Sequence, residues 1–124
     1  MSEKTKIMVV DDSSMIVKII QGFLQSYNIE VVGTAGDGEK AVEIFKKTNP
    51  DIVTLDITMP RMDGLTVLEK MLEIKNSAKV IVISALSDSA TALKALKIGA
   101  KDFIQKPFNE NDFKKVLNRI LNRT

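Results

Sequence analysis

The chain has 124 residues, of which 44% are hydrophobic and 27% are charged, with a net charge of +2. This length and balance are typical of one globular domain, so we expect a single domain over residues 1–124. The sequence contains no cysteine and no histidine, which excludes disulfides, thiol nucleophiles, zinc sites built on these residues and catalytic triads that use histidine. Carboxylates, hydroxyls and lysines remain to carry out any chemistry.

We expect a cytoplasmic protein that is not inserted in a membrane. Met1–Lys6 has no apolar run behind a basic start, so it is neither a signal peptide nor a spanning helix, and we expect no membrane insertion. The absence of cysteine fits a reducing compartment. Charges of both signs are mixed along the chain without a basic stripe interleaved with aromatic residues, which argues against nucleic-acid binding.

The chain consists of five successive units, each with a short apolar run, a loop and a segment with helical spacing. The expected strands, in chain order, are Ile7–Val10, Glu30–Ala35, Ile52–Asp56, Val80–Ile83 and Asp102–Gln105. The segments with a helical apolar face are Met15–Leu24, Ala41–Phe45, Leu65–Leu72, Ser87–Ile98 and a final stretch through Leu121.

Capping and turn residues separate these elements. Ser13 or Ser14 can cap the first helix, and Gly99 closes the fourth. Between the third strand and the third helix, we interpret Pro60 and Gly64 as turn formers.

Strands that are apolar on both faces and alternate with helices predict an α/β fold with a parallel sheet covered on both sides. Right-handed crossovers make this a doubly wound fold, in which ligands bind outside the carboxyl ends of the strands. The pattern continues almost to the last residue, so we expect no output domain.

Polar side chains follow the strands at this edge. Asp11 and Asp12 follow the first strand, Asp56 ends the third, Ser84 follows the fourth and Lys106 follows the fifth. Three carboxylates in one crevice repel one another unless cations compensate them, and an oxygen-only ligand set favours Mg²⁺. The lysine and the serine hydroxyl suit phosphoryl oxygens, which leaves Asp56 as a nucleophile that can form an aspartyl phosphate.

Four segments, in this order, resemble the receiver domains of two-component response regulators. They are Val9–Ser13, Leu55–Gly64, Ile83–Ala85 and Gly99–Phe108. The resemblance extends from Ile7 to about Leu121 and is strongest to stand-alone chemotaxis regulators of the CheY type. It implies a flavodoxin-like fold with five helices and five strands in the order 2-1-3-4-5.

The resemblance also implies a role for each residue at the crevice. Asp56 is the phosphoacceptor, and Lys106 contacts the phosphoryl group. Asp12, Asp56 and the backbone carbonyl of Thr58 would bind Mg²⁺, and Asp11 would reach the metal through water.

The resemblance also implies which residues change conformation on phosphorylation and which affect the lifetime of the aspartyl phosphate. Ser84 and Phe103 are the switch pair, and the bond before Pro107 is expected to be cis. The output face would include Ala92, Lys94, Ala100 and Phe103. Thr58 and Leu86 occupy positions whose side chains, in this family, affect the rate at which the aspartyl phosphate is hydrolysed. Because leucine cannot hold an attacking water, we expect slow self-dephosphorylation.

The implied function is a phosphoryl switch and not an enzyme. A sensor histidine kinase of the chemotaxis type would phosphorylate Asp56, a monomer would then bind a flagellar motor switch protein, and an aspartyl-phosphate phosphatase would reset it. A phosphorelay intermediate remains an alternative.

A flavodoxin-like nucleotide binder is disfavoured because Asp11 and Asp12 stand where a Ser/Thr/Gly-rich phosphate loop would be needed. A phosphatase with an aspartyl intermediate is disfavoured because Asp56-Ile57-Thr58 lacks a second acid.

Overall fold

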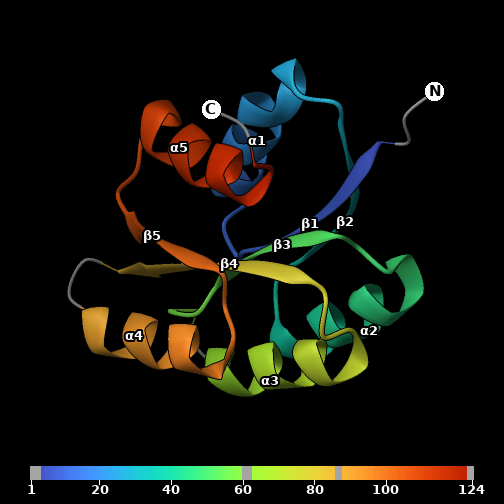
Figure 1. Cartoon of the computed structure of the whole chain (residues 1–124), viewed down its shortest axis with the longest axis vertical. Coiled ribbons are helices and arrows are strands. Elements are labelled where there is room, and N and C mark those ends of the chain that lie inside the picture. Colours follow the sequence, from blue (N-terminus) through green and yellow to red (C-terminus); the bar gives the residue numbers. More distant parts are fainter. Residues whose placement is uncertain (1–3, 60–62, 86–87, 123–124) are drawn as a thin grey trace.

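A parallel sheet runs through the middle of the molecule (Figure 1). The computed structural model describes residues 4–59, 63–85 and 88–122. The strands are β1 (Thr5–Val10), β2 (Ile29–Ala35), β3 (Ile52–Asp56), β4 (Lys79–Ala85) and β5 (Asp102–Lys106). The α-helices are α1 (Ser14–Phe23), α2 (Gly38–Thr48), α3 (Gly64–Ile74), α4 (Ser89–Ile98) and α5 (Glu110–Ile120), and a short 3₁₀ turn, Leu24–Ser26, follows α1.

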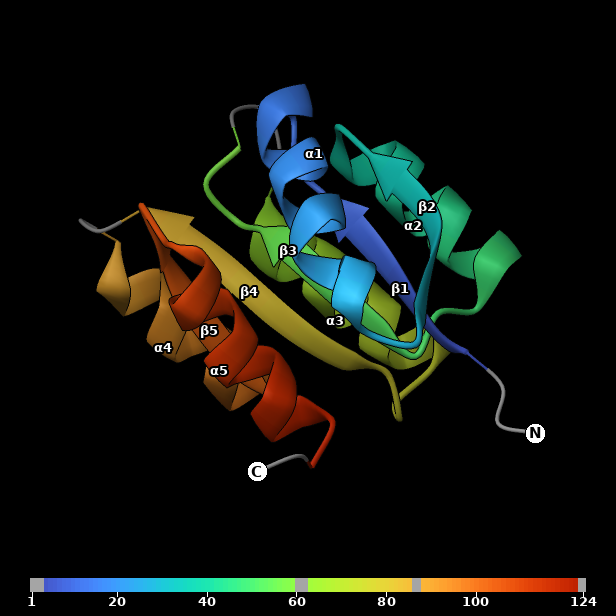
Figure 2. The ribbon, with the colours of Figure 1, turned by 90° about the horizontal axis from the view of Figure 1, so that it is seen from above.

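The sheet has the predicted strand order, β2-β1-β3-β4-β5, and every pairing is parallel. Helices α1 and α5 cover one face, and α2, α3 and α4 cover the other (Figures 1 and 2). This confirms the doubly wound fold. None of the helices in the described part of the chain has the length and apolar character needed to cross a membrane.

Each strand contributes side chains to both faces of the sheet, which is why β1, β3 and β4 are mostly apolar. In β1, Ile7 and Val9 pack into the cluster under α1 and α5, whereas Met8 and Val10 pack into the cluster under α2, α3 and α4. This alternation follows from the two-residue period of a strand. Burying one large apolar side chain of this kind stabilises the fold by about 1.5–3 kcal/mol.

Most helices begin at a polar side chain that accepts a hydrogen bond from the first turn. The sequence left Ser13 and Ser14 as alternatives, and Ser13 is the cap of α1. Asp37 caps α2 and Asp63 caps α3. At α5, Asn109 accepts from a helix amide and the Asp112 carboxylate accepts from the Asn109 N–H, which completes a capping box.

Gly64 is not the plain turn former that the sequence suggested, and Pro60 lies outside the described residues. Gly64 is buried and is the first residue of α3. A Cβ atom added there would lie 2.7 Å from both Cα and Cβ of Ile57, the residue after Asp56. The glycine therefore allows α3 to lie directly against the backbone that holds Asp56.

We expect Gly64→Ala to destabilise the protein by about 1–3 kcal/mol, because the added methyl group overlaps backbone atoms that cannot move freely. Gly22→Ala is the matched control, since no atom lies within 4 Å of a Cβ added in that helix. The free energy of unfolding of the control should rise by about 0.5–1 kcal/mol because alanine has a higher helix propensity than glycine. Urea unfolding measures both, and a Gly64→Ala variant as stable as the wild type would contradict this account of the helix contact.

Candidate functional site

The carboxyl ends of the strands bring acidic and basic side chains together. Asp11 directly follows β1, Asp56 is the last residue of β3, and Lys106 is the last residue of β5. The backbone N–H of Asp11 donates to the Ala35 carbonyl at 3.0 Å, which extends the pairing of β1 with β2 beyond the end of the strand. Asp11 and Asp56 are buried, whereas Asp12 is exposed at the edge of the crevice.

Lys106 links the two buried acids. Its Nζ donates a hydrogen bond to Asp56 Oδ2 at 2.7 Å and lies 3.2 Å from Asp11 Oδ2. The acid side chains are 3% and 0% exposed and the lysine side chain is 27% exposed, so the charges interact with little screening by water. One ammonium group thus compensates part of the charge of two carboxylates.

Thr58 binds the other oxygen of Asp56. The Thr58 backbone N–H donates to Asp56 Oδ1 at 2.8 Å, and the Thr58 hydroxyl donates to the same oxygen at 2.6 Å. Both oxygens of Asp56 are therefore held by donors on opposite sides, which fixes the orientation of the carboxylate.

Their surroundings shift the pKa values of Asp11 and Lys106. Burial raises the pKa of Asp11, the N–H of Ser13 opposes this, and the negative charge of Asp56 adds to it. Partial burial alone would lower the pKa of Lys106, but its hydrogen bond to Asp56 and the charges of Asp56 and Asp11 outweigh that effect, so this pKa is raised. The ammonium form therefore persists at neutral pH.

The three acids can converge on one cation. Asp11, Asp12 and Asp56 can each present a carboxylate oxygen so that these atoms lie within 4.8 Å of one another. Asp11 Oδ2 is buried, and apart from its ion pair with Lys106 it has no hydrogen-bond partner in the described chain. A buried carboxylate oxygen in an all-oxygen set fits a hard divalent cation such as Mg²⁺.

A family model for the response regulator receiver domain matches residues 7–118. The chain belongs to this family. It is 50% identical to the chemotaxis protein CheY of Treponema pallidum, over 93% of this chain and 79% of that protein. It is 39% identical to the CheY of Thermotoga maritima, over 93% of this chain and 96% of that protein.

A solved structure has the same fold as this receiver domain. It is a crystal structure of a complex of CheX, CheY, BeF3 and Mg²⁺ from Borrelia burgdorferi, with a TM-score of 0.86 and 39% sequence identity over 94% of this chain and 89% of that one. The protein is therefore a receiver domain closely related to the CheY chemotaxis regulators, and its role is that of a phosphoacceptor signalling switch.

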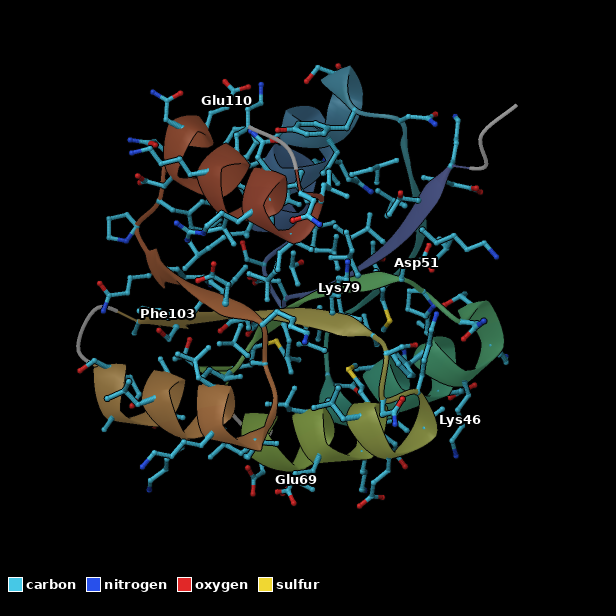
Figure 3. All side chains as sticks on the ribbon, viewed as in Figure 1. Lys46, Asp51, Glu69, Lys79, Phe103 and Glu110 are labelled. Carbon is cyan, nitrogen blue, oxygen red and sulfur yellow. The ribbon has the colours of Figure 1, made fainter. Side chains whose placement is uncertain are left out.

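The expected switch pair lies on the two strands at one side of the sheet of this receiver domain. Ser84 is fully buried on β4, and its Oγ has no hydrogen-bond partner in the part of the chain that the structure describes. Phe103, on the edge strand β5, is half-buried and packs against the cluster under α2, α3 and α4 (Figure 3). In this state the Ser84 hydroxyl is thus not bonded to Asp56 or to Lys106.

The expectations for Pro107, Leu86 and Thr58 can be compared with the structure one by one. The bond between Lys106 and Pro107 is cis. Leu86, expected to tune hydrolysis, lies outside the described residues. The hydroxyl contact of Thr58 with Asp56 was not expected from the sequence; the signal available was a threonine two residues after an aspartate, which commonly forms such local bonds.

The expected output face needs correction at two positions. Ala92 and Ala100 were placed on this face, but they are only 1% and 7% exposed. Ala92 is a buried residue of α4, and Ala100 follows the Gly99 cap of that helix and packs in the core cluster, so neither alanine belongs to the surface. The side chains that α4 presents to solvent include Leu93 and Lys94.

Proposed function

We propose that a sensor histidine kinase transfers a phosphoryl group to Asp56 of this receiver domain, and that the phosphorylated form binds a flagellar motor switch protein in chemotaxis. The pairing of Lys106 with Asp56 at 2.7 Å, beside two further acids, is the observation that carries the proposal. The names of two relatives, both chemotaxis proteins, support a role in chemotaxis.

Asp56, Lys106 and Ser84 have different roles in the proposed phosphoryl transfer. Asp56 Oδ2 accepts a hydrogen bond from Lys106, whereas Oδ1 accepts two from Thr58, so Oδ2 is the freer oxygen for attack on phosphorus. Lys106 lies where its ammonium group can stabilise negative charge on the phosphoryl oxygens. The Ser84 hydroxyl, which has no hydrogen-bond partner among the described residues, is available as a second donor once the group is attached.

A metal ion completes the proposed site. Asp12, Asp56 and the backbone carbonyl of Thr58 would hold Mg²⁺, and Asp11 would reach it through water. Apart from its ion pair with Lys106, the buried Asp11 Oδ2 has no hydrogen-bond partner among the described residues, which supports this role. Bound Mg²⁺ would neutralise negative charge on the transferring phosphoryl group.

The experiment that tests this function compares partner binding in two states. Purified protein with Mg²⁺ and BeF3, which mimics an acyl phosphate, should bind the motor switch protein of the source organism about 5- to 150-fold more tightly than protein without BeF3. An Asp56→Asn variant is the control and should show no BeF3 effect. Equal affinity in both states would contradict a switch, because a switch requires differential binding.

We also propose that the aspartyl phosphate is hydrolysed slowly and depends on a separate aspartyl-phosphate phosphatase. Thr58 and Leu86 offer no amide or carboxylate to hold an attacking water in line with the phosphorus–oxygen bond. The double variant Thr58→Asn with Leu86→Glu should lose the phosphoryl group faster, by about tenfold or more.

Phosphoryl decay, followed by intact mass, measures this lifetime. Thr58→Ser is the matched control, since it keeps the hydroxyl that donates to Asp56, and it should decay at the wild-type rate. Unchanged or slower decay in the double variant would show that these positions do not limit access of water.

A further inference from the structure

A groove of about 720 Å³ lies along α2 and α3, on the face of the sheet opposite α1 and α5 (Figures 1 and 2). The two helices pack against each other, and the described residues that line the groove all belong to them or cap them. The lining includes neither the acid cluster with Lys106 nor a residue of α1, α4 or α5. The groove is therefore separate from the phosphorylation site and from the expected output face.

The charges that line this groove are separated by sign along its length. Both helices begin at the carboxyl edge of the sheet, because each follows the carboxyl end of a parallel strand. At that end the groove has Asp37, Glu39 and Asp63. Further along the helices it has Lys46 and Lys70. Glu39 and Lys46 are about 10 Å apart along the axis of α2, so the groove has an acidic end and a basic end.

Several of these charges have no partner of opposite sign in the described chain. Glu43 and Lys47, which also line the groove, form an ion pair with each other at 3.5 Å. Glu39, Lys46 and Lys70 are exposed, and no ion pair within the described residues includes them. Lys46 points into solvent from the layer of α2 and α3 (Figure 3). These three charges are thus available to a second molecule.

The groove also has an apolar part. Val42 and Val67 line it, and both side chains pack against the core cluster under α2, α3 and α4. Lysine side chains have long apolar stems that can cover such a surface while their ammonium groups reach a carboxylate. An apolar centre with a charged rim is the usual composition of an interface between proteins.

We propose that two copies of this chain associate through this groove, as a symmetric dimer in which α2 and α3 run antiparallel to their counterparts. A two-fold interface brings the same surface of both copies together, so the surface must be complementary to itself. With the helices parallel, the acidic ends would face each other and repel. The antiparallel arrangement places Glu39 opposite the partner's Lys46, and Asp63 opposite the partner's Lys70. The valines of the two copies then meet across the axis.

This dimer leaves the signalling surfaces accessible. Because α1, α4, α5 and the acid cluster do not line the groove, each copy keeps its own phosphorylation site and its own α4 surface exposed. A dimer would therefore bind a partner that displays several targets close together more tightly than a monomer does. The resemblance implied a monomer, whereas the charges of the groove favour a weak dimer, since each exposed ion pair contributes little.

Sedimentation equilibrium measures this association. At about 0.01 M salt, where charges act over about 30 Å, the mass of the wild type should rise above the 13.7 kDa of the monomer as the protein approaches about 1 mM. At about 1 M salt the mass should return to that of the monomer, because screening then limits the interaction to about 3 Å.

Two charge reversals test the antiparallel pairing. Glu39→Lys and Lys46→Glu should each raise the Kd of the dimer about threefold or more, because each places like charges opposite each other at two symmetry-related contacts. Lys18→Glu is the matched control, since it makes the same change of charge at an exposed position of α1, on the other face of the sheet. It should keep the Kd of the wild type.

An equimolar mixture of Glu39→Lys and Lys46→Glu should restore the dimer. One copy then has a lysine at both positions and the other has a glutamate at both, so each contact again joins opposite charges. A mixture that associates no more tightly than the separate variants would overturn the proposal. So would a wild type that stays monomeric at about 1 mM and about 0.01 M salt, or a control that is weakened as much as Lys46→Glu.

Methyl NMR locates the interface independently. Raising the concentration of the wild type should shift the signals of Val42 and Val67 and leave Leu93, which is 58% exposed on α4, unchanged. Shifts at Leu93 without shifts at the valines would place the association on α4 and overturn the proposal. None of these measurements involves phosphorylation, so their failure would leave the function proposed above intact.

Discussion

Replacing Asp56 by asparagine should abolish the gain of one phosphoryl group that the wild-type protein shows with acetyl phosphate and Mg²⁺. The carboxylate supplies the attacking oxygen, and an amide in its place is too weak a nucleophile to form the acyl phosphate. Intact mass spectrometry measures the gain directly. Chelation of Mg²⁺ should also suppress it, because the three acids then repel the incoming anion.

The control for this variant is another aspartate near the same loop. Asp63 caps α3 through the Thr66 amide and is exposed, and asparagine is an equally good cap. Asp63→Asn should therefore fold normally and be phosphorylated at the wild-type rate. If Asp56→Asn still gained the group as fast as the wild type, the nucleophile would be a different residue.

Replacing Lys106 by methionine should slow phosphorylation by about hundredfold, the usual cost of removing one donor that stabilises transition-state charge. Methionine retains much of the length of the side chain but cannot donate to Asp56 or carry charge. The same variant should be less stable than the wild type without Mg²⁺, because Asp11 and Asp56 then have no cation beside them. Added Mg²⁺ should restore part of that stability.

Lys101→Met is the matched control, since Lys101 is exposed just before β5. It should react at the wild-type rate. Phosphorylation rates and unfolding curves of both variants, with and without Mg²⁺, distinguish a loss of chemistry from a loss of folding. A Lys106→Met variant that is phosphorylated as fast as the control would show that this lysine does not stabilise the transferring group.

The fold was largely predictable because its strongest signals are local. Apolar runs such as Ile52–Asp56 are buried on both faces, and the polar residues that end them mark the carboxyl edge of the sheet. Topology alone then brings Asp11, Asp56 and Lys106 to one place, as the distances confirm. The order and direction of the strands therefore predict most of the residues that meet at the site.

The features that were missed depend on how elements pack against one another. The role of Gly64 follows from its approach to Ile57, which no local pattern reveals. Ala92 and Ala100 were assigned to the surface, yet both are buried where α4 and the turn that follows it pack against the rest of the domain. The hydroxyl bond from Thr58 depends on a side-chain rotamer, and many rotamers are compatible with the same sequence.

Reduction of the phosphorylated protein with borohydride, followed by peptide mapping, tests the central claim most directly. Borohydride converts an aspartyl phosphate into homoserine, which marks the acceptor permanently. Asp11, Asp12 and Asp56 are all acids at the crevice, so the method distinguishes among three possible acceptors. The account predicts homoserine at position 56 alone and none in protein treated without a phosphodonor. Homoserine at another aspartate, or no homoserine in protein that has gained the phosphoryl mass, would contradict it.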